Sequence, residues 1–498
     1  MKKLALGPLA LFMVVIWSSA CGDDSSEEKT SREEETDPEE ESTSSDGETD
    51  TGDPSETDET DGTDDTDGTE SPEDPQDLND APTDLPAICR LHTEKVAGED
   101  VGRFPVSIGG DARYPDIAAD SDGRTAVMVW GYIGNDIPTW RLQSTRYDLE
   151  LADDDILREL GEIQEVTLAE TSPLSEQPSI ALSDDGYVVV YQDSRYDDTC
   201  DTTQSGGYDA CLRSVSLLSM DTDGSPTQDE PLRLSEGISK GRPSIARMPD
   251  GGYIVAWNEF VEDTVRTNVV RLSEALEPGD VVVLDEIPDE SNGPVVACND
   301  KVAVIVFATE RQDGIVGVIW PHEETEPNDD QVVIASGNDD MSRPSIAAGE
   351  DGFMVSYNKE IASKAEVFLQ PLDDMGEQDG SPNRATWAFE AVKSSEISWN
   401  GEMYAMVWES STENGVSAWP RTDVKKETLC AYETCSEQIF ATLVKTDGTV
   451  ASEPVMLSHD INRCERSRIV WDGVGWTVVW QGWRELRWQV FHGQMLCD

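Results

Sequence analysis

Hydrophobic and polar residues follow a pattern that recurs along most of this chain. In residues 243–257 it reads as an apolar strand, a tight turn containing Asp and Gly, and a second apolar strand that ends in Trp257. Related segments follow the same order at residues 115–130, 178–191, 294–307, 344–357, 395–408 and 467–480. Self-similarity at such a spacing predicts an array of seven supersecondary units.

Each copy is built from β-structure. The first strand has the form Pro-x-Ile-Ala, and an Asp-Gly or Asn-Gly pair then favours a hairpin turn. The second strand, as in Val188-Val189-Val190-Tyr191, is apolar on both faces, which indicates a sheet covered on both sides. Two shorter strands follow in most copies, at 212–218 and 231–234 in the second copy and at 439–444 and 454–457 in the sixth.

Seven four-stranded sheets that are covered on both faces describe an all-β, seven-bladed β-propeller. The small residue that ends each first strand suits the crowded axis of such a ring. The seventh copy holds only three strands, the last at 486–491, while residues 104–108 resemble the fourth strand of the second copy. The N-terminal segment is therefore predicted to complete the last blade and close the ring.

The N-terminus has the pattern of a targeting segment. Lys2 and Lys3 precede an apolar run over residues 4–17 that is too short to span a bilayer. Residues 18–20 are small and directly precede Cys21, which resembles the lipobox of bacterial lipoproteins, although Ser18 stands where Leu is usual. The resemblance implies a signal peptide over 1–20 and lipidation of Cys21. The alternative is an ordinary secretory signal followed by an incidental cysteine.

Residues 21–84 are predicted to be an acidic, disordered tether. Positions 22–84 hold 28 Asp and Glu against 2 Lys and Arg, with almost no large apolar side chain. Asp64-Asp65-Thr66-Asp67-Gly68 faintly resembles a calcium loop, but no second set of ligands accompanies it, and we predict no metal or cofactor. Residues 85–498 form the propeller, and their excess of negative charge excludes nucleic acid as a partner. We expect a monomer.

The cysteines indicate an oxidising compartment. Apart from Cys21 there are eight, an even number in a chain predicted to be exported. Cys89 and Cys497 lie at the two ends that ring closure would bring together. Two further candidate disulfides are local, and they are Cys200 with Cys211 and Cys430 with Cys435. Nothing in the sequence pairs Cys298 with Cys464.

No catalytic motif stands out. The four histidines, at 92, 322, 459 and 492, lack metal-ligand spacing, and no nucleophile elbow or phosphate loop occurs. Asp and Glu are so abundant that a catalytic carboxylate pair could arise by chance. The aromatic residues that end the second strands are predicted to be core between blades. The cluster of Trp471, Trp476, Trp480, Trp483 and Trp488 has two readings, blade core or the lining of a ligand site.

Residues 101–498, with the repeat Pro-x-Ile-Ala…Asp-Gly…Val-x-Trp, resemble the seven-bladed propeller domains of bacterial surface lipoproteins. The resemblance implies a fold and an envelope location but no activity. The residue directly after Cys21 is Gly22 rather than Asp, and by analogy with lipoprotein sorting this favours the outer membrane. We expect a non-enzymatic binding or scaffold module for a protein or glycan. The alternative is an envelope glycan hydrolase with an Asp/Glu pair at the propeller mouth. The irregular segments 193–209 and 410–437 are candidate contact loops or simple insertions.

Overall fold

A computed structural model describes residue 82 and residues 84–498, apart from gaps at 97–98, 102–103, 108, 121–124, 135–138, 153–154, 168–173, 198–199, 201–210, 236, 262–263, 288–292, 310–313, 338–340, 362–363, 388–391, 412–436, 459–462 and 485–486. The predicted signal peptide, Cys21 and nearly all of the tether lie outside the described residues, as do Cys430, Cys435 and most of both candidate contact loops. Within the described part, no helix is long and apolar enough to cross a membrane.

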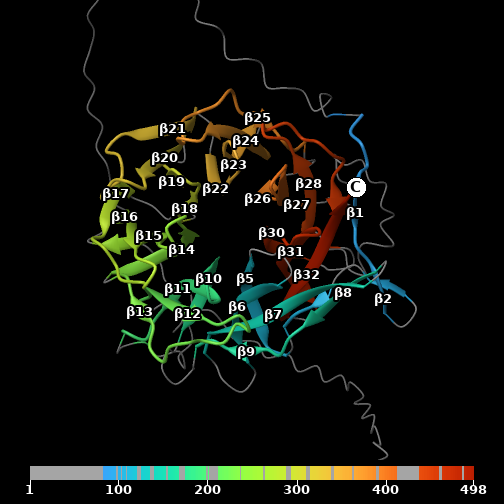
Figure 1. Cartoon of the computed structure of the whole chain (residues 1–498), viewed down its shortest axis with the longest axis horizontal. Coiled ribbons are helices and arrows are strands. Elements are labelled where there is room, and N and C mark those ends of the chain that lie inside the picture. The colour runs from blue at the N-terminus through green and yellow to red at the C-terminus, as the bar shows by residue number, and fades with distance from the viewer. Residues whose placement is uncertain are drawn as a thin grey trace, which may run out of the picture. The chain divides into compact units, whose positions relative to one another are not determined.

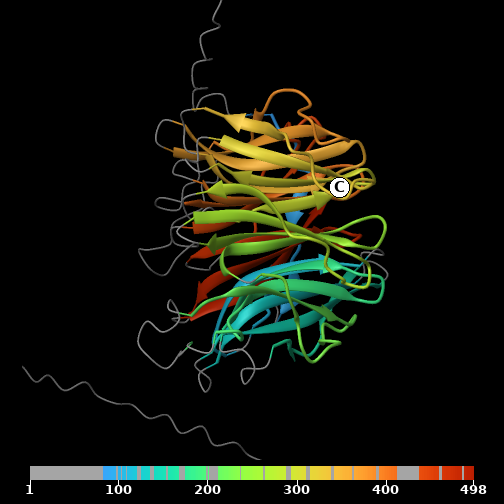
Figure 2. The ribbon, with the colours of Figure 1, turned by 90° about the vertical axis from the view of Figure 1, so that its left-hand side faces the viewer.

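The described residues form a β-propeller of seven blades, which confirms the predicted fold (Figure 1). In each blade the first strand lies nearest the central axis, and the following strands pair antiparallel outward from it. The side view shows the strands of successive blades running between the two faces of the ring (Figure 2).

The first three blades are built from consecutive strands. Blade one contains β5 (Asp111–Ala119), β6 (Thr125–Ile133), β7 (Arg141–Ala152), β8 (Asp155–Leu160) and β9 (Gln164–Glu165). Blade two contains β10 (Ser175–Leu182), β11 (Tyr187–Asp193), β12 (Ser214–Met220) and β13 (Leu232–Arg233). Blade three contains β14 (Ile238–Arg247), β15 (Tyr253–Val261), β16 (Thr264–Leu272) and β17 (Val282–Ile287).

The remaining blades continue the same order. Blade four contains β18 (Val295–Cys298), β19 (Val302–Ala308), β20 (Gly314–Pro321) and β21 (Gln331–Ser336). Blade five contains β22 (Met341–Ala348), β23 (Gly352–Ile361), β24 (Lys364–Asp373) and β25 (Asn383–Arg384). Blade six contains β26 (Val392–Trp399), β27 (Tyr404–Ser411), β28 (Glu437–Val444) and β29 (Val455–Met456). Blade seven contains β30 (Cys464–Trp471), β31 (Trp476–Arg484) and β32 (Arg487–Cys497).

The core lies between neighbouring blades. Seven of the apolar clusters in the described part each join two adjacent blades, and one of them joins blade seven to blade one through Val479, Val490 and Trp130. The aromatic residues that end the second strands are buried in these clusters, at 0–1% exposure. Their predicted role as core is confirmed. The small residue that ends the first strand, such as Ala118 or Ala181, packs in the same clusters.

N-terminal strands complete blade seven as predicted, but in two pieces. β4 (Phe104–Pro105) and the earlier β1 (Cys89–Leu91) both pair with β32, and the hairpin of β2 (Glu94–Val96) and β3 (Glu99–Val101) lies between them in the chain. β32 runs six residues beyond the predicted end at 491, because β1 pairs with its last residues.

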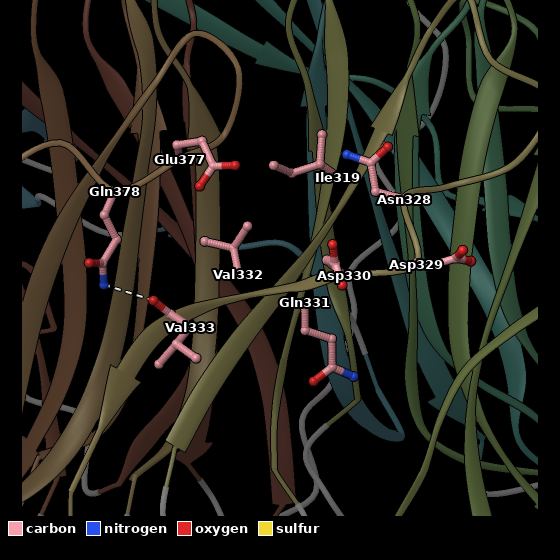
Figure 3. Close-up of a pocket in the computed structure, with 9 residues that line it drawn as sticks. All are labelled: Ile319, Asn328, Asp329, Asp330, Gln331, Val332, Val333, Glu377 and Gln378. Carbon is pink, nitrogen blue, oxygen red and sulfur yellow. Dashed lines mark hydrogen bonds between the residues drawn. The ribbon is translucent and has the colours of Figure 1, made fainter.

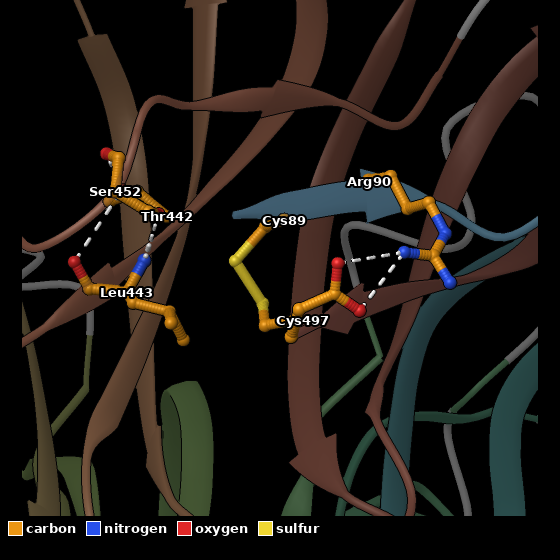
Figure 4. Close-up of a disulfide and its surroundings, with 7 residues drawn as sticks. Cys89, Arg90, Thr442, Leu443, Ser452 and Cys497 are labelled. Carbon is orange, nitrogen blue, oxygen red and sulfur yellow. Dashed lines mark hydrogen bonds and ion pairs between the residues drawn. A yellow bond between two sulfur atoms is a disulfide. The ribbon is translucent and has the colours of Figure 1, made fainter. Parts of the chain in front are cut away.

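A disulfide joins Cys89 to Cys497 at this seam, and Arg90 contacts Asp498 at 3.2 Å beside it (Figure 4). The Val106 N–H also donates to the Val490 carbonyl at 2.8 Å. The segment that leads into blade one is therefore joined to blade seven by backbone pairing, by apolar packing and by a covalent bond.

Candidate functional site

The first strands carry a bulge at the same place in most blades. The ladder to the second strand shifts register at Arg113–Asp116, Glu176–Ser179, Lys240–Ser244, Ser342–Ser345, Val392–Ser395 and Glu465–Arg468. Four non-glycine residues in these bulges have a left-handed backbone, and they are Tyr114, Gln177, Arg343 and Arg466, with φ of 52–61°. Non-glycine residues adopt this conformation at a cost, and bulges re-aim side chains next to functional sites. The repeated strain marks the axis as the candidate site.

The bulges surround a central channel with a cavity of about 840 Å³. The residue between the Pro and Ile positions of each repeat lines it, and around the ring this residue is Asp116, Ser179, Ser244, Val295, Ser345, Glu396 and Arg468. Three of these side chains also accept a hydrogen bond from the next blade. Asp116 accepts from Ile180 N at 2.9 Å, Ser244 from Val296 N at 3.2 Å and Ser345 from Ile397 N at 3.4 Å.

The channel is basic although the chain is strongly acidic. Seven cationic and four carboxylate side chains line it, a net of +3, whereas the whole chain carries −67. The cations are Arg213, Arg242, Arg343, Lys393, Arg463, Arg466 and Arg468, and the carboxylates are Asp116, Glu396, Glu409 and Glu465. A local field opposite in sign to that of the surrounding surface concentrates anions in the channel.

An ion-pair network ties distant blades together across the channel. Arg242 of blade three contacts Asp116 of blade one at 2.6 Å, and Arg468 of blade seven lies 3.8 Å from the same carboxylate. Arg468 also pairs with Glu396 of blade six. Ser345 donates to Glu396 at 2.8 Å. Four blades therefore share one network of ion pairs, and a fifth joins it through a hydroxyl group.

Two carboxylic acids in the channel are perturbed by burial. Burial raises the pKa of Glu396 to about 7, against the opposing effect of Arg242 and of the Ser345 hydrogen bond. Burial also raises the pKa of Glu409, which accepts hydrogen bonds from the Ser394 hydroxyl at 2.6 Å and from the Arg466 backbone. Carboxylates are therefore present in the channel, as the hydrolase alternative requires, and burial favours the protonated form of these two.

Polar side chains directly after the buried aromatic residues hold the bulges in place. Each forms a hydrogen bond with the bulge backbone of the next blade. Gln192 donates to the Gly241 carbonyl at 2.6 Å, and Asn358 donates to the Lys393 carbonyl at 2.9 Å. Glu409 accepts from Arg466 N, and Gln481 accepts from Tyr114 N at 2.8 Å. The channel geometry is thus fixed by buried hydrogen bonds between blades.

A second hollow, of about 690 Å³, lies on the outer side of blades four and five (Figure 3). Asp329, Asp330 and Glu377 line it, and Gln378 donates to the Val333 carbonyl at 2.8 Å. Its acidic side chains come from turns beside the outer strand β21. Only two blades contribute to this hollow, whereas the first strands of all seven blades contribute to the channel.

The remaining predicted site residues are placed as follows. Cys200 and Cys211 form a disulfide in blade two, as Cys89 and Cys497 do at the seam. Cys298 has a free thiol, and burial raises the pKa of that thiol to about 12. In the tryptophan cluster Trp476 and Trp480 are fully buried, and Trp483 packs edge-on against Trp488 at 5.5 Å. None of the five lines the channel, and Trp471, Trp476 and Trp480 pack in the apolar cluster between blades six and seven.

No known protein family matches the chain, and no curated protein sequence matches it either. Solved structures of similar architecture include the polysaccharide lyase Uly1, with 10% identity over 79% of this chain and 90% of that one and a TM-score of 0.44. A Trypanosoma rangeli sialidase in complex with 2,3-difluorosialic acid matches with 9% identity over 83% of this chain and 57% of that one, at a TM-score of 0.35. The NanB sialidase of Streptococcus pneumoniae matches with 10% identity over 79% of this chain and 69% of that one, at a TM-score of 0.38. None of these likenesses assigns an activity.

Proposed function

We propose that this protein is an exported, lipid-anchored binding module that takes a glycan into the central channel without cleaving it. The observation that carries the proposal is the channel itself, a cavity of about 840 Å³ whose lining converges from the first strands of the blades. Concave sites of this size suit small ligands or short oligosaccharides, whereas protein partners are recognised through broader surfaces with apolar and aromatic centres. The lining is rich in hydroxyl, amide and guanidinium groups that can bond sugar hydroxyls.

Export and anchoring rest on separate observations. Two disulfides fit an oxidising compartment. The N-terminal segment with Cys21 supports a lipid anchor, and Gly22 supports the outer membrane. The acidic tether between Cys21 and the propeller would let the head search space at a distance from the bilayer.

An array of neutral and acidic glycans, followed by calorimetry on the hits, tests the proposal. Ser342 lines the channel, so Ser342→Tyr should fill it and weaken binding at least tenfold. The matched control is Asp330→Tyr, which adds the same side chain to the outer hollow and should leave binding unchanged. Binding lost only in the control, or no glycan bound at all, contradicts the proposal. If a protein from the native envelope binds at the channel instead, the ligand is a protein and not a glycan.

A second candidate function has one specific observation in its favour. Burial raises the pKa of Glu396 to about 7, so part of this acid is protonated near neutral pH and can donate a proton, as a general acid must in glycoside hydrolysis. Incubation of each bound glycan with the protein, followed by analysis of new reducing ends, separates the two functions. Reducing ends released by the wild type but not by Glu396→Gln would establish the hydrolase.

A further inference from the structure

Five of the seven cations that line the channel are matched by carboxylates. These contacts are Arg213 with Glu176 at 3.0 Å, Arg242 with Asp116 at 2.6 Å, Arg463 with Glu437 at 2.7 Å, Lys393 with Glu437, and Arg468 with Glu396. Arg343 and Arg466 differ from them, because neither guanidinium forms an ion pair with a carboxylate among the described residues. Arg343 and Arg466 are therefore the two cations of the channel lining without an ion-pair partner in the described part of the chain.

Arg343 and Arg466 occupy the same position of the repeat, in blades five and seven on either side of blade six. Both have the left-handed backbone of the bulge, with φ of 54° and 61°. Arg343 donates to the Lys393 carbonyl of blade six. The guanidinium of Arg466 lies over the ring of Tyr114 in blade one, with its central carbon 5.3 Å from the ring centre. The two side chains are thus held by contacts other than ion pairs.

Burial and neighbouring charges both act on Arg343. Burial lowers the pKa of Arg343, and the charge of Arg466 adds to this shift, whereas the charges of Glu409 and Glu465 oppose it. Glu409 is itself buried and bonded to Ser394, and Glu465 lies 3.5 Å from Arg463. An anion held by the two arginines would supply the ion-pair partner that both lack among the described residues.

We propose that Arg343 and Arg466 bind the anionic group of an acidic sugar, a carboxylate or a sulfate ester, as the ligand enters the channel. Two guanidinium forks present paired N–H donors to two or three coplanar or tetrahedral oxygens, which a Lys ammonium cannot do. The inference rests on the proposed glycan-binding function and names the class of glycan.

The test uses calorimetry with three probes and the full-length protein. The probes are oligogalacturonate, the same chain with its carboxyls methyl-esterified, and a sulfated galactan oligosaccharide. Oligogalacturonate or the sulfated chain should bind, and the neutral ester should bind at least tenfold more weakly, because charge-assisted hydrogen bonds are lost. Preference for the first probe identifies a carboxylate as the recognised group, and preference for the sulfated one identifies a sulfate.

The second test changes the protein instead of the ligand, by substitution of each arginine with Gln. Gln177 has the same backbone conformation at the equivalent place in blade two, so Arg343→Gln and Arg466→Gln suit the fold. Each should weaken binding of the acidic probe roughly tenfold to a hundredfold, while Arg343→Lys should recover only part of the loss. Arg247→Gln is the control, because it removes one positive charge from a partly exposed pair outside the channel.

The outcomes separate this inference from the proposed function. Equal binding of the neutral ester, unaffected by either Gln variant, overturns the acidic-sugar inference and leaves glycan binding in place. Absence of binding by every glycan overturns both. An equal loss in Arg247→Gln would show that overall charge, rather than the arginine pair, governs binding, and would also overturn the inference.

Discussion

The carboxylate of Asp116 in blade one lies 2.6 Å from the guanidinium of Arg242 in blade three, and it also accepts a hydrogen bond from Ile180 N of the blade between them. One side chain thus joins three consecutive blades at the axis. Most other contacts between blades in the described part join neighbours only. The pair is mostly buried, so removal of one partner leaves the other charge in a poorly solvated place.

Asp116→Asn should therefore lower the free energy of unfolding by about 3 kcal/mol, measured by chemical denaturation at pH 7. The control is Asp184→Asn. Asp184 pairs with Arg247 at a more exposed position, where such contacts are worth less than about 1 kcal/mol. A similar effect of both substitutions would mean that the axial network does not hold the blades together.

Glu396 should make stability depend on pH in a definite direction. Its pKa is raised in the folded state from an ordinary 4.5 to about 7, so the folded protein holds this proton more tightly than the unfolded chain. Its contribution favours folding below about pH 4.5 and is lost as pH rises through 7. About a fifth of the side chain stays exposed, so we expect an amplitude of about 1–2 kcal/mol.

Denaturation of the wild type and of Glu396→Gln between about pH 2.5 and pH 7.5 measures this contribution, since the variant should lose it. Asp447→Asn serves as a control of opposite sign. A side-chain hydrogen bond from Thr449 lowers the pKa of Asp447, so its contribution is present above about pH 4 and is lost as pH falls further. Parallel pH profiles of the wild type and Glu396→Gln would contradict the prediction.

Deletion of residues 85–109 should destabilise the propeller far more than deletion of an equal length of residues 22–84. The deletion removes β1 and β4, exposes the edge of β32 and separates the apolar cluster of blades one and seven from Val106. It also removes the disulfide between Cys89 and Cys497, which are 408 residues apart and for which the chain-entropy model gives about 6 kcal/mol. Thermal melts of the two deletions check the prediction. Equal melting temperatures would mean that the seam contributes little.

Cys21→Ser should release the protein from the membrane fraction. Lipid attached at this position is the only anchor that the sequence predicts, and stable attachment needs more than one acyl chain. Fractionation of cells that produce the wild type and the variant measures the effect. Cys298→Ser is the matched control, because it removes a free thiol of the propeller and should leave the protein with the membranes. Sedimentation of Cys21→Ser with membranes would contradict the lipid anchor.

The fold could be predicted because the features that define it are local in sequence. Pro-x-Ile-Ala, the Asp-Gly turn and the closing aromatic recur within about fifteen residues, and each expresses a constraint of one hairpin. Closure by the N-terminal segment followed from counting strands. Its division into β1 and β4 could not be predicted, because a strand of two or three residues has no periodicity of its own.

The channel could not be assembled from the sequence, although a signal for it was present. The variable residue of Pro-x-Ile-Ala is charged in three copies, as Asp116, Glu396 and Arg468, at a place where the others have Ser or Val. In a strand buried on both faces, a charge at a fixed register requires a partner, and only the ring geometry brings residues about 350 positions apart into contact. The bulges that turn Arg343 and Arg466 toward the axis depend on backbone torsions that no local motif specifies.

The bond between Cys89 and Cys497 also determines how the propeller responds to mechanical force. A pull on the chain before residue 84 acts first on the contacts of Leu85, Pro86 and Ile88 and then on β1, whose short pairing with β32 would separate one hydrogen bond at a time. The disulfide lies at the first residue of β1, so the force passes at once into β32 and the full width of blade seven. The same covalent link that closes the ring therefore lets the domain resist tension from whatever holds the N-terminus.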